Sequence, residues 1–147
     1  MKKFSMILLV LLMGCKSVLT SSDASPLIYM KKTACMGTCP DYDISIFPNG
    51  KVVLNARQFI EKEGTFKAKI SNEEREALIE AFESGGFDSF NNEYKSNRTD
   101  LPTTTISFNY AGKNKRIIDY DGAPKALKDL EAKVHALISS LSWKEVK

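Results

Sequence analysis

Six short segments have the alternation of apolar and polar positions, or the apolar content, that is typical of half-buried strands. They are residues 27–34, 42–47, 52–56, 66–70, 103–110 and 115–120. Asn49-Gly50 lies between the second and third segments, and both residues tolerate the positive φ of a tight hairpin. Glu63-Gly64 and Gly112 mark two further turns. The pattern therefore predicts an antiparallel meander and, later in the chain, a separate hairpin.

The hydrophobic period changes to that of a helix in two places. Ser71 and Glu74 have the spacing of a capping box at the start of the first helix, and Gly85-Gly86 ends it. The second helix starts near Pro124, a residue that suits a first helical turn. The apolar faces comprise Ala77, Leu78, Ala81 and Phe82 in the first helix, and Leu127, Leu130, Val134, Leu137, Ile138 and Leu141 in the second. We therefore expect residues 27–147 to form a single two-layer α+β domain, with a mostly antiparallel sheet of about six strands and two helices packed on one face.

The N-terminus has the features of a secretory signal. Lys2 and Lys3 precede an apolar run, residues 4–13, that is shorter than the about 20 residues of a membrane-spanning helix. The run ends at Leu12-Met13-Gly14-Cys15, which resembles the lipobox of bacterial lipoproteins. This resemblance implies that residues 1–14 are removed and that Cys15 carries fatty acyl chains such as palmitate. An ordinary secretory signal with a coincidental cysteine, or an uncleaved anchor, remains an alternative.

Residues 15–26 are rich in serine, and we interpret them as a flexible tether behind the lipidated cysteine. Lys16, and not an aspartate, follows Cys15, which by lipoprotein sorting rules favours the outer membrane. No acidic cluster follows Cys15, which favours the periplasmic face. The expected location is therefore the bacterial cell envelope, with the domain anchored through lipid and facing the periplasm.

Charge excludes one class of partner. The 147 residues include 21 Lys and Arg and 18 Asp and Glu, and removal of Lys2 and Lys3 with the leader leaves 19 basic residues against 18 acidic ones. Nucleic-acid binding needs a basic patch or stripe, so we expect no nucleic-acid partner. The membrane, and an envelope protein or a small ligand, are the expected partners.

Cys35 and Cys39 are the two cysteines left if Cys15 is acylated. In an oxidising compartment a disulfide is the expected state of such a close pair, and Gly37 between them eases a tight loop. A redox pair is the alternative, although thioredoxin-type enzymes use a C-x-x-C spacing. Copper(I) bound with Met30 or Met36 is another. We expect no metal or other cofactor.

Residues 99–104 combine a turn former, a proline and three threonines at a strand entrance. They form a candidate ligand rim with Arg98, Asp100 and Tyr120. The alternative is local capping of the strand by Asp100 and the threonine hydroxyls.

Other polar residues give no catalytic constellation. His135, the single histidine, lies roughly 115° from the centre of the apolar stripe and is predicted to be a solvated flank residue. Asp119 and Asp121 lack the oxygen spacing of a calcium loop, and Asp121 is predicted to cap the last helix. We therefore expect no catalytic residues.

Three motifs carry a resemblance to a family: residues 31–50, with a C-x-G-x-C-P-x-Y core, residues 99–104, and residues 118–124. Together they resemble an uncharacterised family of secreted or lipoprotein domains, a domain of unknown function. The resemblance implies no activity or cofactor. The positions it assigns to the family pattern are Cys35, Gly37, Cys39, Pro40, Tyr42, Asp100, Pro102, Gly122 and Pro124.

These observations favour a non-catalytic, membrane-tethered envelope domain that binds a macromolecule or a small ligand. The alternative is an envelope thiol protein, redox-active or copper-binding, that uses Cys35 and Cys39. A small inhibitor of an envelope hydrolase is a third hypothesis.

Replacing Cys15 with serine should abolish acylation, because only the thiol accepts the lipid. Intact-mass analysis of detergent-extracted protein should find the wild type heavier than its processed polypeptide by the mass of the lipid, and the variant without that mass. A wild-type protein without lipid would overturn the lipoprotein assignment.

Overall fold

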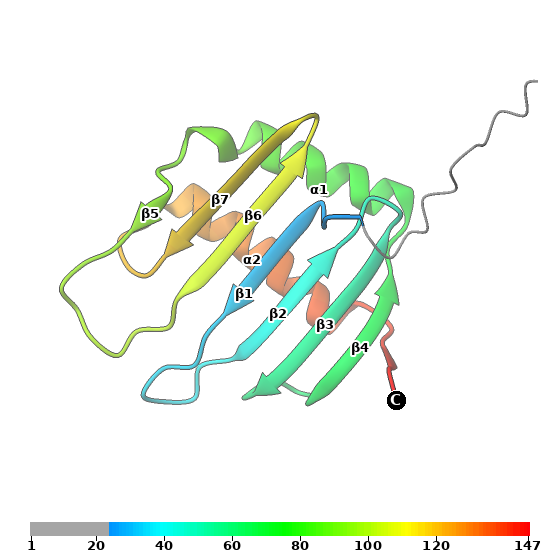
Figure 1. Ribbon diagram of the computed structural model, residues 1–147, viewed down its shortest axis with the longest axis horizontal. Helices are drawn as coiled ribbons and strands as arrows, with labels where there is room; N and C mark the ends of the chain where they lie inside the picture. Colours follow the sequence, from blue (N-terminus) through cyan, green and yellow to red (C-terminus); the bar gives the residue numbers. More distant parts are fainter. Residues whose placement is uncertain (1–23) are drawn as a thin grey trace, which may run out of the picture.

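The computed structural model describes residues 24–147 and has two layers, a sheet and a pair of helices behind it (Figure 1). The predicted signal peptide, Cys15 and most of the predicted tether lie outside the described residues. The elements in chain order are β1 (Ile28–Lys32), β2 (Asp41–Ile46), β3 (Lys51–Gln58), β4 (Gly64–Lys69), α1 (Asn72–Ser84), a short 3-10 helix (Phe87–Ser89), β5 (Glu93–Tyr94), β6 (Thr104–Tyr110), β7 (Lys113–Asp119), α2 (Lys125–Ser140) and β8 (Lys144–Glu145). The predicted α+β class is confirmed.

The strands form one sheet in the order β5-β7-β6-β1-β2-β3-β4-β8. All neighbours are antiparallel except β5 and β7, which are parallel. The prediction of about six strands was too low. The two missed strands, β5 and β8, have two residues each and lie at the edges of the sheet. A strand of two residues is too short to produce an alternating pattern, so no periodicity could reveal it.

The predicted hairpin between β2 and β3 is confirmed and depends on Gly50. Its φ is +79°, and a Cβ there would lie 2.7 Å from the carbonyl oxygen of Ile70. The Gly50 N–H donates to the Phe47 carbonyl, and the Gly50 carbonyl accepts from the Ile70 N–H, both at 2.9 Å. The β2–β3 turn is therefore also hydrogen-bonded to the residue that follows β4.

The predicted capping box of α1 is present. The Glu74 carboxylate accepts from the Ser71 N–H at 2.7 Å, and the Ser71 hydroxyl accepts from the Glu74 N–H at 3.1 Å. Helix α2 begins directly after Pro124, as predicted, but the prediction that Asp121 caps it is wrong. No side chain caps this helix, and the Asp121 carboxylate instead accepts from the Ser96 hydroxyl at 2.6 Å.

Both helices cover the same face of the sheet (Figure 1). The core between the layers contains alternate residues of β1, β2, β3 and β6 together with the apolar stripes of α1 and α2. Leu78, Ile79 and Phe82 are the buried residues of α1, and Leu127, Leu130, Glu131 and Val134 are those of α2. Within residues 24–147, no helix is long and apolar enough to cross a membrane.

The predicted disulfide between Cys35 and Cys39 is present, with their Cα atoms 5.5 Å apart. It closes the loop that joins β1 to β2. Met36 at the tip of this loop is 84% exposed, so the loop owes little of its order to apolar burial. The covalent bond is therefore an important constraint on the tip of this loop.

Replacing both Cys35 and Cys39 with serine should lower the free energy of unfolding by about 2 kcal/mol, the loop-entropy value for a ring of about five residues. Urea unfolding measures this difference. Reductant should lower the stability of the wild type to that of the variant and leave the variant unchanged. Equal midpoints for the oxidised wild type and the variant would contradict the structural role.

Candidate functional site

Four polar side chains form a row across the helix-facing side of the sheet, at one end of its central strands. Lys32 on β1 is paired with Tyr42 on β2 and with Thr104 on β6, and Thr104 is paired with Asp119 on β7. Tyr42, Thr104 and Asp119 are buried, and Lys32 is half-buried. The inner face of the sheet is therefore apolar along most of its length and polar at this end.

Helix α2 covers this row with a polar stripe of its own. Lys128 and Glu131 are one turn apart, and the Glu131 side chain is only 3% exposed. The Lys128 ammonium forms an ion pair with Asp119 and lies 3.8 Å from Glu131 Oε2. The Lys32 ammonium approaches the same Oε2 atom from the sheet, at 4.0 Å. Glu131 thus lies between two lysines, one on each layer.

The pKa of Glu131 is raised from 4.5 to about 7. Burial is the largest cause, and the negative charge of Asp119 and a side-chain hydrogen bond to Asp119 also raise the pKa, whereas Lys128 and Lys32 lower it. Oε1 of Glu131 has no hydrogen-bond partner among the described residues. Glu131 is therefore a buried carboxyl group that exchanges its proton near neutral pH.

His135 continues the stripe one turn beyond Glu131. The residue is exposed, as predicted, but its Nδ1 atom lies 2.7 Å from the hydroxyl oxygen of the buried Tyr42, a hydrogen bond that the sequence did not reveal. Burial, with a smaller effect of Glu131, raises the pKa of Tyr42, so the phenol keeps its proton. Burial and the nearby Lys32 lower the pKa of His135. The Tyr42 hydroxyl and Nδ1 of the neutral imidazole share this hydrogen bond, and the tautomer of the ring sets which of the two donates.

Lys32, Lys128, Glu131 and His135 open onto a cavity of about 280 Å³. We call it the α2 cleft; it is lined by Lys32, Pro40, Lys128, Glu131, Ala132 and His135. Pro40 comes from the chain directly after Cys39, so the disulfide-closed loop supplies one wall of the cleft. The cleft combines two cations, a titratable buried acid and a short apolar wall.

The predicted ligand rim lies outside this cleft. The Tyr120 hydroxyl donates to the Arg98 carbonyl at 2.7 Å, so these two residues are brought together. Asp100 has φ +67° and accepts from the hydroxyl of its neighbour Thr99 at 3.1 Å. The Arg98 guanidinium lies 3.6 Å from Asp121. All three rim residues are in or beside one exposed loop, and their role in binding stays a prediction.

The copper hypothesis gains no geometric support. Met30 is fully buried in the core, whereas Met36 is exposed at the loop tip. Among residues 24–147, no three His, Cys, Asp or Glu side chains lie close enough together to hold a metal ion.

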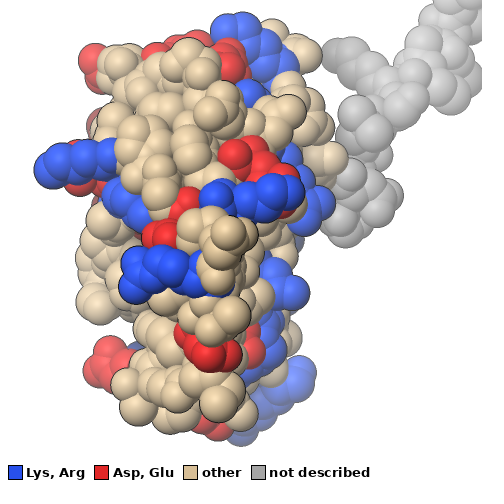
Figure 2. Space-filling model, turned by 90° about the vertical axis from the view of Figure 1, so that its left-hand side faces the viewer, with Lys and Arg blue, Asp and Glu red and all other residues tan. Residues whose placement is uncertain are grey.

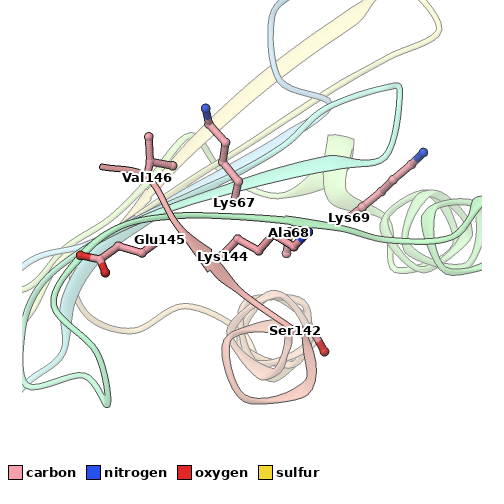
Figure 3. A pocket seen from close by; sticks show the side chains of 7 residues that line it. All are labelled: Lys67, Ala68, Lys69, Ser142, Lys144, Glu145 and Val146. Carbon is pink, nitrogen blue, oxygen red and sulfur yellow. The ribbon is translucent and has the colours of Figure 1, made fainter.

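A larger hollow, about 550 Å³, lies beside β4 and β8 (Figure 3). Its lining residues are Lys67, Ala68, Lys69, Ser142, Lys144, Glu145 and Val146. They are exposed except for the half-buried Ala68, so this hollow has no buried polar group with which to orient a ligand. We therefore assign the chemistry to the smaller α2 cleft.

The side of the domain that faces the viewer in Figure 2 has no continuous patch of one charge, since its basic and acidic residues are interspersed. On the face of the sheet away from the helices, Arg57 donates to Asp41 at 2.7 Å and to Asp43 at 2.6 Å. These exposed charges are already paired with one another, which further favours the α2 cleft as the candidate site.

Sequence reasoning missed Lys32, Lys128 and Glu131, although two of them leave a signal. Glu131 interrupts the apolar stripe of α2, four residues after Leu127, where a charged side chain must be buried. Lys32 continues the inward alternation of Ile28 and Met30 in β1. A charged residue at a predicted core position is the signal that would have found both.

Fold and cleft together define a two-layer α+β domain that carries a buried, titratable site at the ends of its central strands. The chain belongs to the family DUF6438, described as a domain of unknown function, which matches residues 26–138. The match includes every residue that lines the α2 cleft. No curated protein matches the chain.

Replacing Glu131 with glutamine should change how stability depends on pH. The folded pKa of about 7 exceeds the value of 4.5 for a free glutamate, so the stabilisation from the protonated group is complete below pH 4.5 and is lost as the pH rises through 7. The wild type should lose on the order of 3 kcal/mol from this group by pH 8, which the variant should retain. Urea unfolding between pH 4.5 and 8 measures both profiles.

The matched control is Glu80→Gln, at an exposed position on α1. Its profile should follow that of the wild type. Parallel profiles for Glu131→Gln and the wild type would show that Glu131 is an ordinary carboxylate.

Proposed function

We propose that the chain is a lipid-anchored protein of the bacterial cell envelope whose domain, residues 27–147, is a non-catalytic module that binds a small ligand in the α2 cleft. The N-terminal leader, residues 1–14, supports this cellular location, because its apolar run ends at Leu12-Met13-Gly14-Cys15. The disulfide between Cys35 and Cys39 agrees with an oxidising compartment. Lys16 after the lipidated cysteine favours the outer membrane, with the domain facing the periplasm.

One observation carries the binding function: Glu131 is almost fully buried, lines a cavity, and has an oxygen without a hydrogen-bond partner among the described residues. Nearly all buried polar atoms in proteins are hydrogen-bonded, and leaving one unpaired costs about 1–3 kcal/mol. Glu131 lines the cleft, so a polar ligand group bound there would lie beside this carboxyl and would offset part of the cost. Replacing buried charged groups with apolar residues of similar volume is often neutral or stabilising, so a binding role gives a reason for the acid at this position.

The length of the predicted tether is compatible with a binding module held close to the membrane. Residues 15–26 could extend at most about 40 Å from the lipid, since a fully extended residue spans up to about 3.5 Å. Several acyl chains on Cys15 would give stable anchoring, because each buried CH2 adds about 0.8 kcal/mol. A binding module held this way samples the aqueous space next to the membrane without leaving it.

The second candidate is a thiol protein that uses Cys35 and Cys39. It is favoured by one observation: both cysteines are half-buried, and Pro40, which follows them, lines the cleft. A reduction potential below about −300 mV would identify a structural bridge, and a value of about −120 to −200 mV would identify a catalytic one.

Filling the cleft should abolish binding. Ala132 is an exposed residue of α2 that lines the cavity, so Ala132→Trp should block it without disturbing the core. A library of small metabolites, screened by thermal shift and confirmed by calorimetry, should contain a ligand that stabilises the wild type and not this variant.

The control is Ala126→Trp, also exposed on α2 but not part of the cleft lining. It should bind as the wild type does. A ligand whose binding survives Ala132→Trp, or one that the wild type converts into a product, would overturn the proposal.

A further inference from the structure

We propose that the ligand of the α2 cleft is a small organic carboxylate with a short apolar group, and that it binds together with one proton, which is taken up by Glu131. This inference rests on the proposed binding function and specifies its ligand. The arrangement of charges around Glu131 carries it.

Each element packed against Glu131 contributes a defined group. Lys32 comes from β1 and Lys128 from α2 itself, with distances to Oε2 of 4.0 and 3.8 Å. Asp119, from β7, is held in its ion pair with Lys128. The groups without charge are Thr104 of β6, the protonated Tyr42 of β2 and the neutral His135 of α2.

Lys32 is the cation available to a ligand. Lys128 already has Asp119 as a partner, whereas Glu131 is the one carboxylate that lies within 4.0 Å of the Lys32 ammonium among residues 24–147. That distance is too long for a hydrogen bond. An incoming carboxylate could therefore become the direct partner of Lys32.

The two lysines exclude a cationic ligand. An ammonium group placed against Glu131 would lie close to both Lys32 and Lys128, and like charges about 4 Å apart repel by about 4 kcal/mol near a protein surface. A carboxylate ligand instead meets the attraction of Lys32, since the charge of Lys128 is offset by Asp119. With Glu131 protonated, the charges of Lys32, Lys128 and Asp119 sum to +1, which favours an anion.

Glu131 must lose its charge when such an anion binds, because two carboxylates cannot both stay ionised at short range in a buried site. Its pKa of about 7 makes the proton easy to take up near neutral pH. Protonation removes the repulsion between the Glu131 side chain and the ligand carboxylate. The proton comes from the solvent, so binding consumes one proton overall.

The size and walls of the cleft limit the rest of the ligand. Its volume, about 280 Å³, is just below the range of about 300–1,000 Å³ that is usual for ligand sites. Pro40, Ala132 and the His135 ring give it an apolar side. A short aliphatic chain fits this wall, and a large or multiply charged ligand does not.

The test is calorimetric titration of the folded domain with propionate, butyrate, inorganic phosphate and propylamine. At pH 8, propionate or butyrate should bind with the uptake of close to one proton, measured as the dependence of the heat on the ionisation enthalpy of the buffer. Affinity should fall about tenfold between pH 8 and pH 9, because the fraction of protonated Glu131 falls by that factor. Phosphate and propylamine should bind at least tenfold more weakly.

Two variants separate the roles of the side chains. Glu131→Gln should bind the carboxylate without proton uptake and with no change of affinity between pH 8 and pH 9. Lys32→Met should weaken binding at least tenfold. Its matched control is Lys31→Met, next to Lys32 but exposed on the other face of β1, which should bind as the wild type does.

Carboxylate binding without proton uptake, equal uptake in Glu131→Gln, or preferential binding of phosphate or propylamine would each overturn this inference. Proton uptake is measured on the wild type alone, so it tests this inference even if a variant fails to fold. Another kind of ligand that Ala132→Trp blocks would refute the carboxylate and leave the binding function standing. A cleft that binds nothing in the wider library would refute both.

Discussion

The pairing of β1 with both of its neighbours is the interaction on which the rest of the structure depends. This strand of five residues lies between the β2–β3–β4 meander and the β6–β7 hairpin, and it is antiparallel to both β2 and β6. Without it the sheet would be divided into two parts with no hydrogen-bonded register between them. The same pairing aligns Lys32 with Tyr42 and Thr104, so the register that assembles the core also assembles the polar row of the cleft.

The core requires apolar residues between the two layers, whereas the cleft requires polar and charged residues there. Ile28 and Met30 are fully buried, and two residues after Met30 the same face of β1 carries Lys32. On α2, Glu131 occupies a position that an apolar residue would fill at lower cost. Local rules of folding are commonly broken at functional sites. Here the break is confined to one end of the sheet, where the cavity and the disulfide-closed loop are found.

Local signals were enough to predict most of the fold. The Asn49-Gly50 turn, the capping box at Ser71 and the start of α2 at Pro124 each involve only neighbouring residues, and each is present. The disulfide followed from the expected compartment and the short spacing of its cysteines. Strands β5 and β8 were missed because two residues carry no period. Asp121 was misassigned because its partner, Ser96, lies in a loop 25 residues away.

The cleft could not be predicted from local signals, because the residues that form it are far apart in the sequence. The pairing of β1 with β6 joins Lys32 to Thr104, more than seventy residues later, and nothing in one sequence gives that register. His135 was correctly expected to be exposed, yet its bond to Tyr42 spans 93 positions. Inward-facing charges at residues 32 and 131 could have been noticed individually. Their meeting required the three-dimensional arrangement.

The direction of β1 has a consequence for how the domain would work on a surface. The chain enters β1 at Ile28 and reaches the cleft at Lys32, four residues further on, which at about 3.3 Å per residue is about 13 Å away along the strand. The start of β1 and the mouth of the cleft are thus at opposite ends of the same strand. If the N-terminus is anchored in lipid as we propose, the cleft would open away from the membrane, towards solutes in the aqueous phase.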